Sequence, residues 1–122
     1  MLRQTVLVVE DEPLVSLMVE DELADAGFES VITDTASAAI ELIEKTETQP
    51  IAIITDIRLR EGSGWDVGRA ARRRFPHLPI IYTSGDAAGE WKTSGVNSSI
   101  FLQKPVPINT IAQNLQRLCG AG

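Results

Sequence analysis

Cysteine is nearly absent from this sequence, since Cys119 is the only one among 122 residues. A disulfide within the chain is therefore excluded, and no cluster of cysteines or histidines has the spacing of a zinc site. Long apolar runs are missing as well. None approaches the roughly 18 residues of a membrane span, and the first run meets acids at Glu10 instead of the small residues of a cleavage site. We therefore expect a cytoplasmic protein of a reducing compartment, with no membrane partner.

Positive charge is also scarce, with 11 lysines and arginines against 17 aspartates and glutamates and a formal net charge of -6. A protein that binds nucleic acid by neutralising phosphates needs the opposite balance, so we expect no direct nucleic-acid partner. The 122 residues, of which 43% are hydrophobic and 23% charged, are typical of one globular domain. We expect that domain to span residues 1–120 and no output domain to follow it.

Short apolar runs alternate with segments of helical period along the chain. Four runs lack the polar alternation of a half-exposed strand, which favours strands of a parallel sheet that is covered on both faces. A weaker fifth run precedes the second of them in the spatial plan of alternating strands and helices. The expected strands are 5–9, 29–33, 51–55, 79–84 and 99–103. The expected helices are 13–26, 36–46, 64–75, 87–95 and 107–118, the last with Pro107 in its first turn and Ile108 facing inward.

This alternation predicts an α/β domain with a parallel sheet and right-handed crossovers. In such sheets ligands bind at the carboxyl ends of the strands, where this sequence places its acids, hydroxyls and one lysine. These side chains are far apart in sequence but should meet at one edge of the sheet. They are Glu10, Asp11, Asp56, Thr83, Ser84 and Lys104.

The predicted site is strongly acidic. Two carboxylates about 4 Å apart repel by ~4 kcal/mol at an effective dielectric near 20, so three of them need positive charge nearby. Hard oxygen ligands without histidine or cysteine suit Mg²⁺, and Lys104 supplies a second cation. A carboxylate beside a metal ion, a lysine and a hydroxyl is equipped to attack phosphorus, which predicts an aspartyl phosphate on Asp56.

The segments "VLVVEDE", "IITDIRL", "YTSG" and "FLQKP", in this order and spacing, resemble the receiver domain of two-component response regulators. The resemblance covers practically the whole chain. It implies a flavodoxin-like three-layer α/β/α sandwich whose five parallel strands have the order 2-1-3-4-5.

The resemblance also implies roles for the site residues. Asp56 is the implied phosphoacceptor, and Lys104 contacts the phosphoryl group. Glu10, Asp11 and Asp56 hold Mg²⁺ together with the backbone carbonyl of Arg58.

One hydroxyl in receivers also contacts the phosphoryl group. Ser84 fits it better than Thr83, because the family's hydroxyl directly precedes a small residue, here Gly85; Thr83 stays the alternative. Ser84 and Phe101 resemble the pair that switches conformation on phosphorylation, and the Lys104–Pro105 bond is expected to be cis.

Three positions near Asp56 set this chain apart or tune its chemistry. Arg60 occupies a position where receivers commonly have proline, so the shape of the loop is open. Arg58 and Asp86 lie where receivers tune dephosphorylation. Arg58 either shields the phosphoryl group or pairs with Asp86.

The implied function is a phosphoacceptor that takes a phosphoryl group from a histidine kinase or a histidine phosphotransfer protein and signals through protein contacts. The downstream target is unknown, and receivers often dimerise through their fourth and fifth helices. Such a domain is not an enzyme in the usual sense. Two alternatives stay open: a degenerate receiver that binds partners without phosphorylation, and a phosphatase of the haloacid-dehalogenase type. The phosphatase needs an aspartate as general acid where this chain has Arg58.

Overall fold

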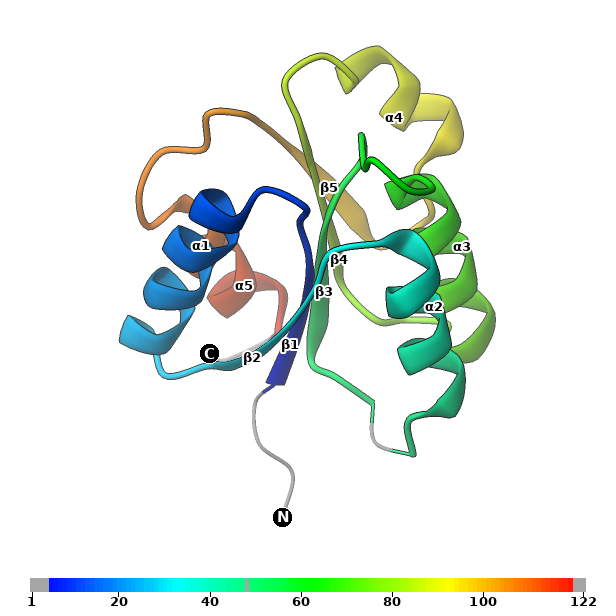
Figure 1. The fold of residues 1–122 in the computed structure, drawn as a ribbon, viewed down its shortest axis with the longest axis horizontal. Helices are drawn as coiled ribbons and strands as arrows, with labels where there is room; N and C mark the ends of the chain where they lie inside the picture. The colour runs from blue at the N-terminus through cyan, green and yellow to red at the C-terminus, as the bar shows by residue number, and fades with distance from the viewer. Residues whose placement is uncertain (1–4, 48, 120–122) are drawn as a thin grey trace.

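A computed structural model describes residues 5–47 and 49–119 of the chain. Its sheet has five parallel strands in the order β2-β1-β3-β4-β5, as predicted (Figure 1). The strands are β1 (Thr5–Val9), β2 (Glu29–Thr33), β3 (Ala52–Asp56), β4 (Ile80–Ser84) and β5 (Ser99–Gln103). The ends of the predicted domain, residues 1–4 and 120, lie outside the described residues.

Five helices cover the two faces of this sheet and complete the predicted three-layer sandwich (Figure 1). One face carries α1 and α5, and the other carries α2 and α3, with α4 beyond them. The helices are α1 (Pro13–Asp25), α2 (Ala36–Lys45), α3 (Gly64–Arg74), α4 (Ala88–Ser94) and α5 (Thr110–Leu118). Within the described part of the chain, no helix is both long and apolar enough to cross a membrane.

The strand pleat divides the core into two clusters. Alternate residues of β1 point to opposite faces, so Leu7 packs toward α2 and α3 while Val8 packs toward α1 and α5. All residues of β3 and β4 are buried, because helices cover both of their faces. Parallel pairing places Asp56 of β3 beside Thr83 of β4, which brings the carboxyl ends of the central strands to one edge.

Local sequence signals set most of the helix ends. The Thr35 hydroxyl accepts a hydrogen bond from the backbone N–H of Ala38 and caps α2. Pro13 opens α1, and the chain leaves this helix through Gly27, whose φ of +91° favours glycine. Gly68 lets α3 approach the sheet closely, since a methyl group at this position would overlap the Tyr82 hydroxyl.

The predicted start of the last helix was wrong. Pro107 precedes α5 by three residues, because Asn109 adopts a left-handed conformation with φ of +70° and the chain turns there before the helix begins at Thr110. Ile108 is consequently 83% exposed instead of facing inward. The weak predicted fourth helix is confirmed: α4 has seven residues and buries none of them.

The α1 core contact predicts a stability difference between two leucines of the same helix. Leu23 is fully buried against the sheet, whereas Leu17 is 53% exposed. We expect Leu23→Ala to lower the free energy of unfolding by about 2–5 kcal/mol, since it leaves a cavity. Leu17→Ala should change it by less than about 0.5 kcal/mol. Urea denaturation followed by circular dichroism measures both, and equal losses would contradict this packing.

Candidate functional site

Three carboxylates meet at the carboxyl edge of the sheet. Glu10 and Asp11 directly follow β1, and Asp56 ends β3, which pairs with β1 in parallel. One carboxylate oxygen from each residue lies within 4.8 Å of one from the other two, and all three residues are buried. The convergence predicted for these acids is therefore confirmed.

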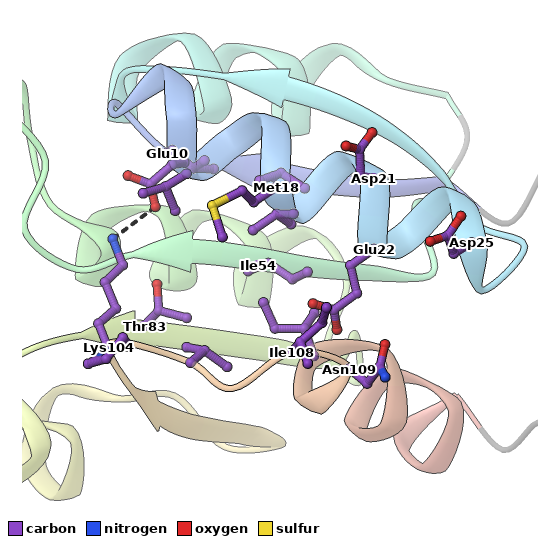
Figure 2. Close-up of a pocket in the computed structure, with 17 residues that line it drawn as sticks. Glu10, Met18, Asp21, Glu22, Asp25, Ile54, Thr83, Lys104, Ile108 and Asn109 are labelled. Atoms are coloured by element: carbon purple, nitrogen blue, oxygen red, sulfur yellow. Dashed lines mark hydrogen bonds and ion pairs between the residues drawn. The ribbon is translucent and has the colours of Figure 1, made fainter.

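Lys104 joins this cluster from the other side of the sheet's centre. It follows β5, and its backbone N–H donates to the Ser84 carbonyl at 2.9 Å, which continues the pairing of β4 and β5. The Lys104 Nζ donates to Glu10 Oε1 at 2.9 Å and to Asp56 Oδ2 at 3.1 Å; Figure 2 shows the first of these contacts. The Lys104–Pro105 bond is cis, as expected.

Burial dominates the titration of these groups. Desolvation raises the pKa of Glu10 and of Asp56, although Lys104 opposes the shift in both. Burial alone would lower the pKa of Lys104, but its hydrogen bond to Glu10 and the charge of Asp56 raise it. The cluster therefore keeps a protonated lysine, and its crowded acids would gain from further positive charge.

The donor set fits a hard divalent cation. Glu10, Asp11 and Asp56 offer carboxylate oxygens, and this group of candidate ligands contains no histidine or cysteine. Oxygen-only sets of this kind suit Mg²⁺ and not Zn²⁺. The backbone N–H of Arg58 donates to the Asp56 carboxylate, so the backbone of the following loop borders the cluster.

Arg60 contacts the remaining acid of the cluster. Its backbone N–H donates to Asp11 Oδ2 at 2.6 Å, and its guanidinium Nη2 donates to the Asp11 carbonyl at 2.7 Å. The Nε atom lies 3.6 Å from the same carboxylate oxygen. Sequence reasoning left the shape of this loop open, and the structure places it against Asp11.

The Ser84 hydroxyl belongs to a second network beside the acids. It donates to Asp86 Oδ1 at 2.9 Å and accepts from the Asp86 backbone N–H at 3.2 Å. Arg58 Nε donates to the same Asp86 oxygen at 3.1 Å, and its Nη2 donates to Glu90 of α4 at 2.6 Å. Of the two predicted alternatives for Arg58, the structure has the pairing with Asp86. This pairing is the main cause that lowers the pKa of Asp86.

The two other predicted residues lie on opposite faces of the sheet. The alternative hydroxyl, Thr83, lines a cavity together with Glu10 and Lys104 (Figure 2). Phe101 of β5 is partly buried and packs against the core cluster that contains Tyr82, its register partner on β4. Phe101 therefore lies on the α4 side of the sheet, where Ser84 also finds its partners.

A cavity of about 580 Å³ opens between α1 and α5 (Figure 2). Met18 of α1 and Ile108 before α5 line it and are largely exposed, and Leu14 and Leu17 are exposed on α1 as well. The acidic cluster borders this cavity through Glu10. Sequence reasoning missed the cavity, although the unusual exposure of four apolar residues would have indicated it.

Known proteins share this fold and site region. The family model of the response regulator receiver domain matches residues 6–116. TcrX of Mycobacterium tuberculosis, a probable transcriptional regulatory protein, is 29% identical over 116 residues, which are 93% of this chain and 49% of that protein. The chain thus spans about half the length of this relative.

Two solved structures support the same assignment. A response regulator receiver protein from Sinorhizobium medicae WSM419 is 36% identical with a TM-score of 0.90, covering 96% of this chain and 94% of that one. The receiver domain of the sensor histidine kinase PA1611 from Pseudomonas aeruginosa PAO1 is 26% identical with a TM-score of 0.83, covering 98% and 99%. That structure has a magnesium ion coordinated in the active site cleft. The chain described here belongs to the family of response regulator receiver domains.

Proposed function

We propose that this chain is a phosphoacceptor receiver that takes a phosphoryl group from a phosphohistidine onto Asp56. The observation that supports it best is the junction of three buried carboxylates with Lys104 at the carboxyl edge of the sheet. Receiver domains pair with histidine kinases, so the donor is a histidine kinase or a histidine phosphotransfer protein. The signal then passes to a protein target through surface contacts.

Asp56 is suited to nucleophilic attack by its position. It ends a strand that is buried along its whole length, so the core fixes its backbone while its carboxylate faces the edge. One carboxylate oxygen forms a bond to phosphorus as the bond from phosphorus to the donor's imidazole nitrogen breaks, and the imidazole leaves with that electron pair. Lys104, which already contacts Asp56, is placed to stabilise charge on the phosphoryl oxygens.

Glu10, Asp11, Asp56 and the backbone carbonyl of Arg58 are the proposed ligands of Mg²⁺. When bound, this cation offsets the charge of the acids and of the phosphoryl group. The crowding of the acids supports the proposal, as does the magnesium ion in the related PA1611 receiver domain.

The proposed conformational signal starts at Ser84. Its hydroxyl is held by Asp86, and a phosphoryl group on Asp56 would compete for this donor. Ser84 and Phe101 lie on the same side of the sheet, so a shift of Ser84 would change the packing available to Phe101. Arg58 ties Asp86 to Glu90, and this connection would carry the change into α4, which buries no residue.

The surface beside the cavity is the proposed docking site of the phosphohistidine donor. Leu14, Leu17 and Met18 are exposed on α1, next to the acidic cluster. An exposed apolar patch rimmed by polar residues is typical of a protein interface. Dimerisation through α4 and α5 stays a prediction from the resemblance.

The proposed phosphoacceptor predicts the outcome of a chemical test. Incubation with Mg²⁺ and acetyl phosphate should add one phosphoryl group to the wild-type chain, as measured by intact mass spectrometry. Asp56→Asn should abolish the adduct because the nucleophile is gone. Asp34→Asn is the matched control, since Asp34 directly follows β2 at the same edge but is exposed and outside the acidic cluster. Chelation of Mg²⁺ should also prevent the adduct.

Other results of this test favour the alternative functions. A chain that forms no adduct with any donor would be a degenerate receiver. Repeated turnover of assorted phosphomonoesters would favour the phosphatase, although the Arg58 guanidinium, paired with Asp86 and Glu90, cannot serve as its general acid.

The Arg58 network predicts a change in the lifetime of the aspartyl phosphate. Arg58→Ala removes the main cause that keeps the pKa of Asp86 low, so Asp86 becomes a better general base for an attacking water. We expect the lifetime to shorten by about threefold to tenfold. Loss of radiolabel after donor removal measures it, and the double variant Arg58→Ala/Asp86→Asn should restore a long lifetime. An unchanged lifetime in Arg58→Ala would contradict this role.

The docking surface predicts that two phosphodonors respond differently to one substitution. Leu17→Glu should slow transfer from a phosphorylated histidine phosphotransfer protein at least about tenfold, because a charge replaces an apolar contact. Acetyl phosphate should react as with wild type, since it needs no docking. Leu42→Glu on α2 is the control, because Leu42 is also exposed but lies on the opposite layer. Equal slowing with both donors would argue against the surface.

A further inference from the structure

Each acid of the cluster has a resident cation in this structure. Lys104 bridges Glu10 and Asp56, while Arg60 contacts Asp11. The two cations differ in setting. The Lys104 side chain is mostly buried, whereas the Arg60 side chain is 80% exposed and its partner Asp11 is almost fully buried. Arg60 is therefore the cation that solvent can reach and that can move away.

Arg60 makes two kinds of contact with Asp11. Its backbone N–H donates to Oδ2 at 2.6 Å, which orients the carboxylate whatever side chain the residue has. Its guanidinium reaches the Asp11 carbonyl at 2.7 Å and brings its charge to 3.6 Å from Oδ2. The first contact prepares Asp11 as a ligand. The second places a positive charge where a bound divalent cation would lie close by, so the two charges repel each other.

We propose that Arg60 is a displaceable counter-ion, whose guanidinium compensates Asp11 when no divalent cation is bound and weakens divalent-cation binding by competing for this carboxylate. The inference rests on the proposed function, since it concerns the same cation site. It also assigns a consequence to the arginine that stands where receivers commonly have proline. A chain with this residue would need a higher Mg²⁺ concentration before it accepts a phosphoryl group.

The loop that carries Arg60 has supports that do not depend on its side chain. Arg58 and Ser63 form an isolated antiparallel bridge across it. The backbone N–H of Ala36 donates to the Glu61 carbonyl at 3.1 Å, and the Ser37 hydroxyl donates to the Glu61 carboxylate. Replacement of the Arg60 side chain should therefore leave the loop and the backbone contact to Asp11 in place.

Isothermal titration calorimetry with Mg²⁺ alone tests this role on the full chain. We expect Arg60→Gln to bind Mg²⁺ about twofold to fivefold more tightly than wild type, the range set by an exposed ion pair. Arg60→Lys keeps the charge and should bind about as wild type does. Arg69→Gln is the matched control, because Arg69 is also exposed and pairs with an aspartate, Asp66, on α3 away from the acidic cluster.

Salt gives a readout that a purely structural role of Arg60 would not move. The gain in affinity of Arg60→Gln over wild type should shrink as ionic strength rises from about 0.02 M to about 0.5 M, because the competing charge is exposed and is screened. Equal or weaker Mg²⁺ binding by Arg60→Gln, with wild type binding measurably, would overturn this inference alone. Absence of Mg²⁺ binding by all four proteins would overturn it together with the proposed cation site.

Discussion

Charge compensation at the carboxyl edge of the sheet is the constraint on which the rest of this structure depends. Parallel pairing of β1 and β3 brings Glu10, Asp11 and Asp56 together and buries them, where their mutual repulsion is least screened. Burial already raises the pKa of Glu10 and Asp56. The site is stable only with positive charge in it, and Lys104 meets that need from the end of β5.

The loop after β3 adds two further cations with different partners. Arg58 turns toward α4 and pairs with Asp86 and Glu90, while Arg60 turns back to Asp11. One arginine thus connects the site to the most weakly packed helix, and the other lies at the proposed cation site. The same short loop therefore links the chemistry of Asp56 to both its input and its output. Because both side chains are at least half exposed, each contact can break at modest cost.

Most of the fold was predictable because its signals are local. Buried parallel strands read as short apolar runs, and the predicted bounds of β3 and β4 differ from the observed ones by one residue. The start of α5 was not predictable, because Pro107 is a favourable first residue of a helix and only the left-handed turn at Asn109 delays it. That turn leaves Ile108 exposed beside the cavity, a feature of the path between β5 and α5 and not of the helical pattern.

The sequence by itself determined the alternation of strands and helices and the identity of the acids and the lysine at the strand ends. It did so because periodicity of two or 3.6 residues and the residue after each strand are local properties. Only the tertiary structure decided which charges meet. The partners of Arg58, Arg60 and Ser84 depend on where a flexible loop lies against α4 and the sheet edge, and residues that are 28 to 49 positions apart in sequence make those contacts. Long-range contacts of this kind follow from packing, which no local pattern encodes.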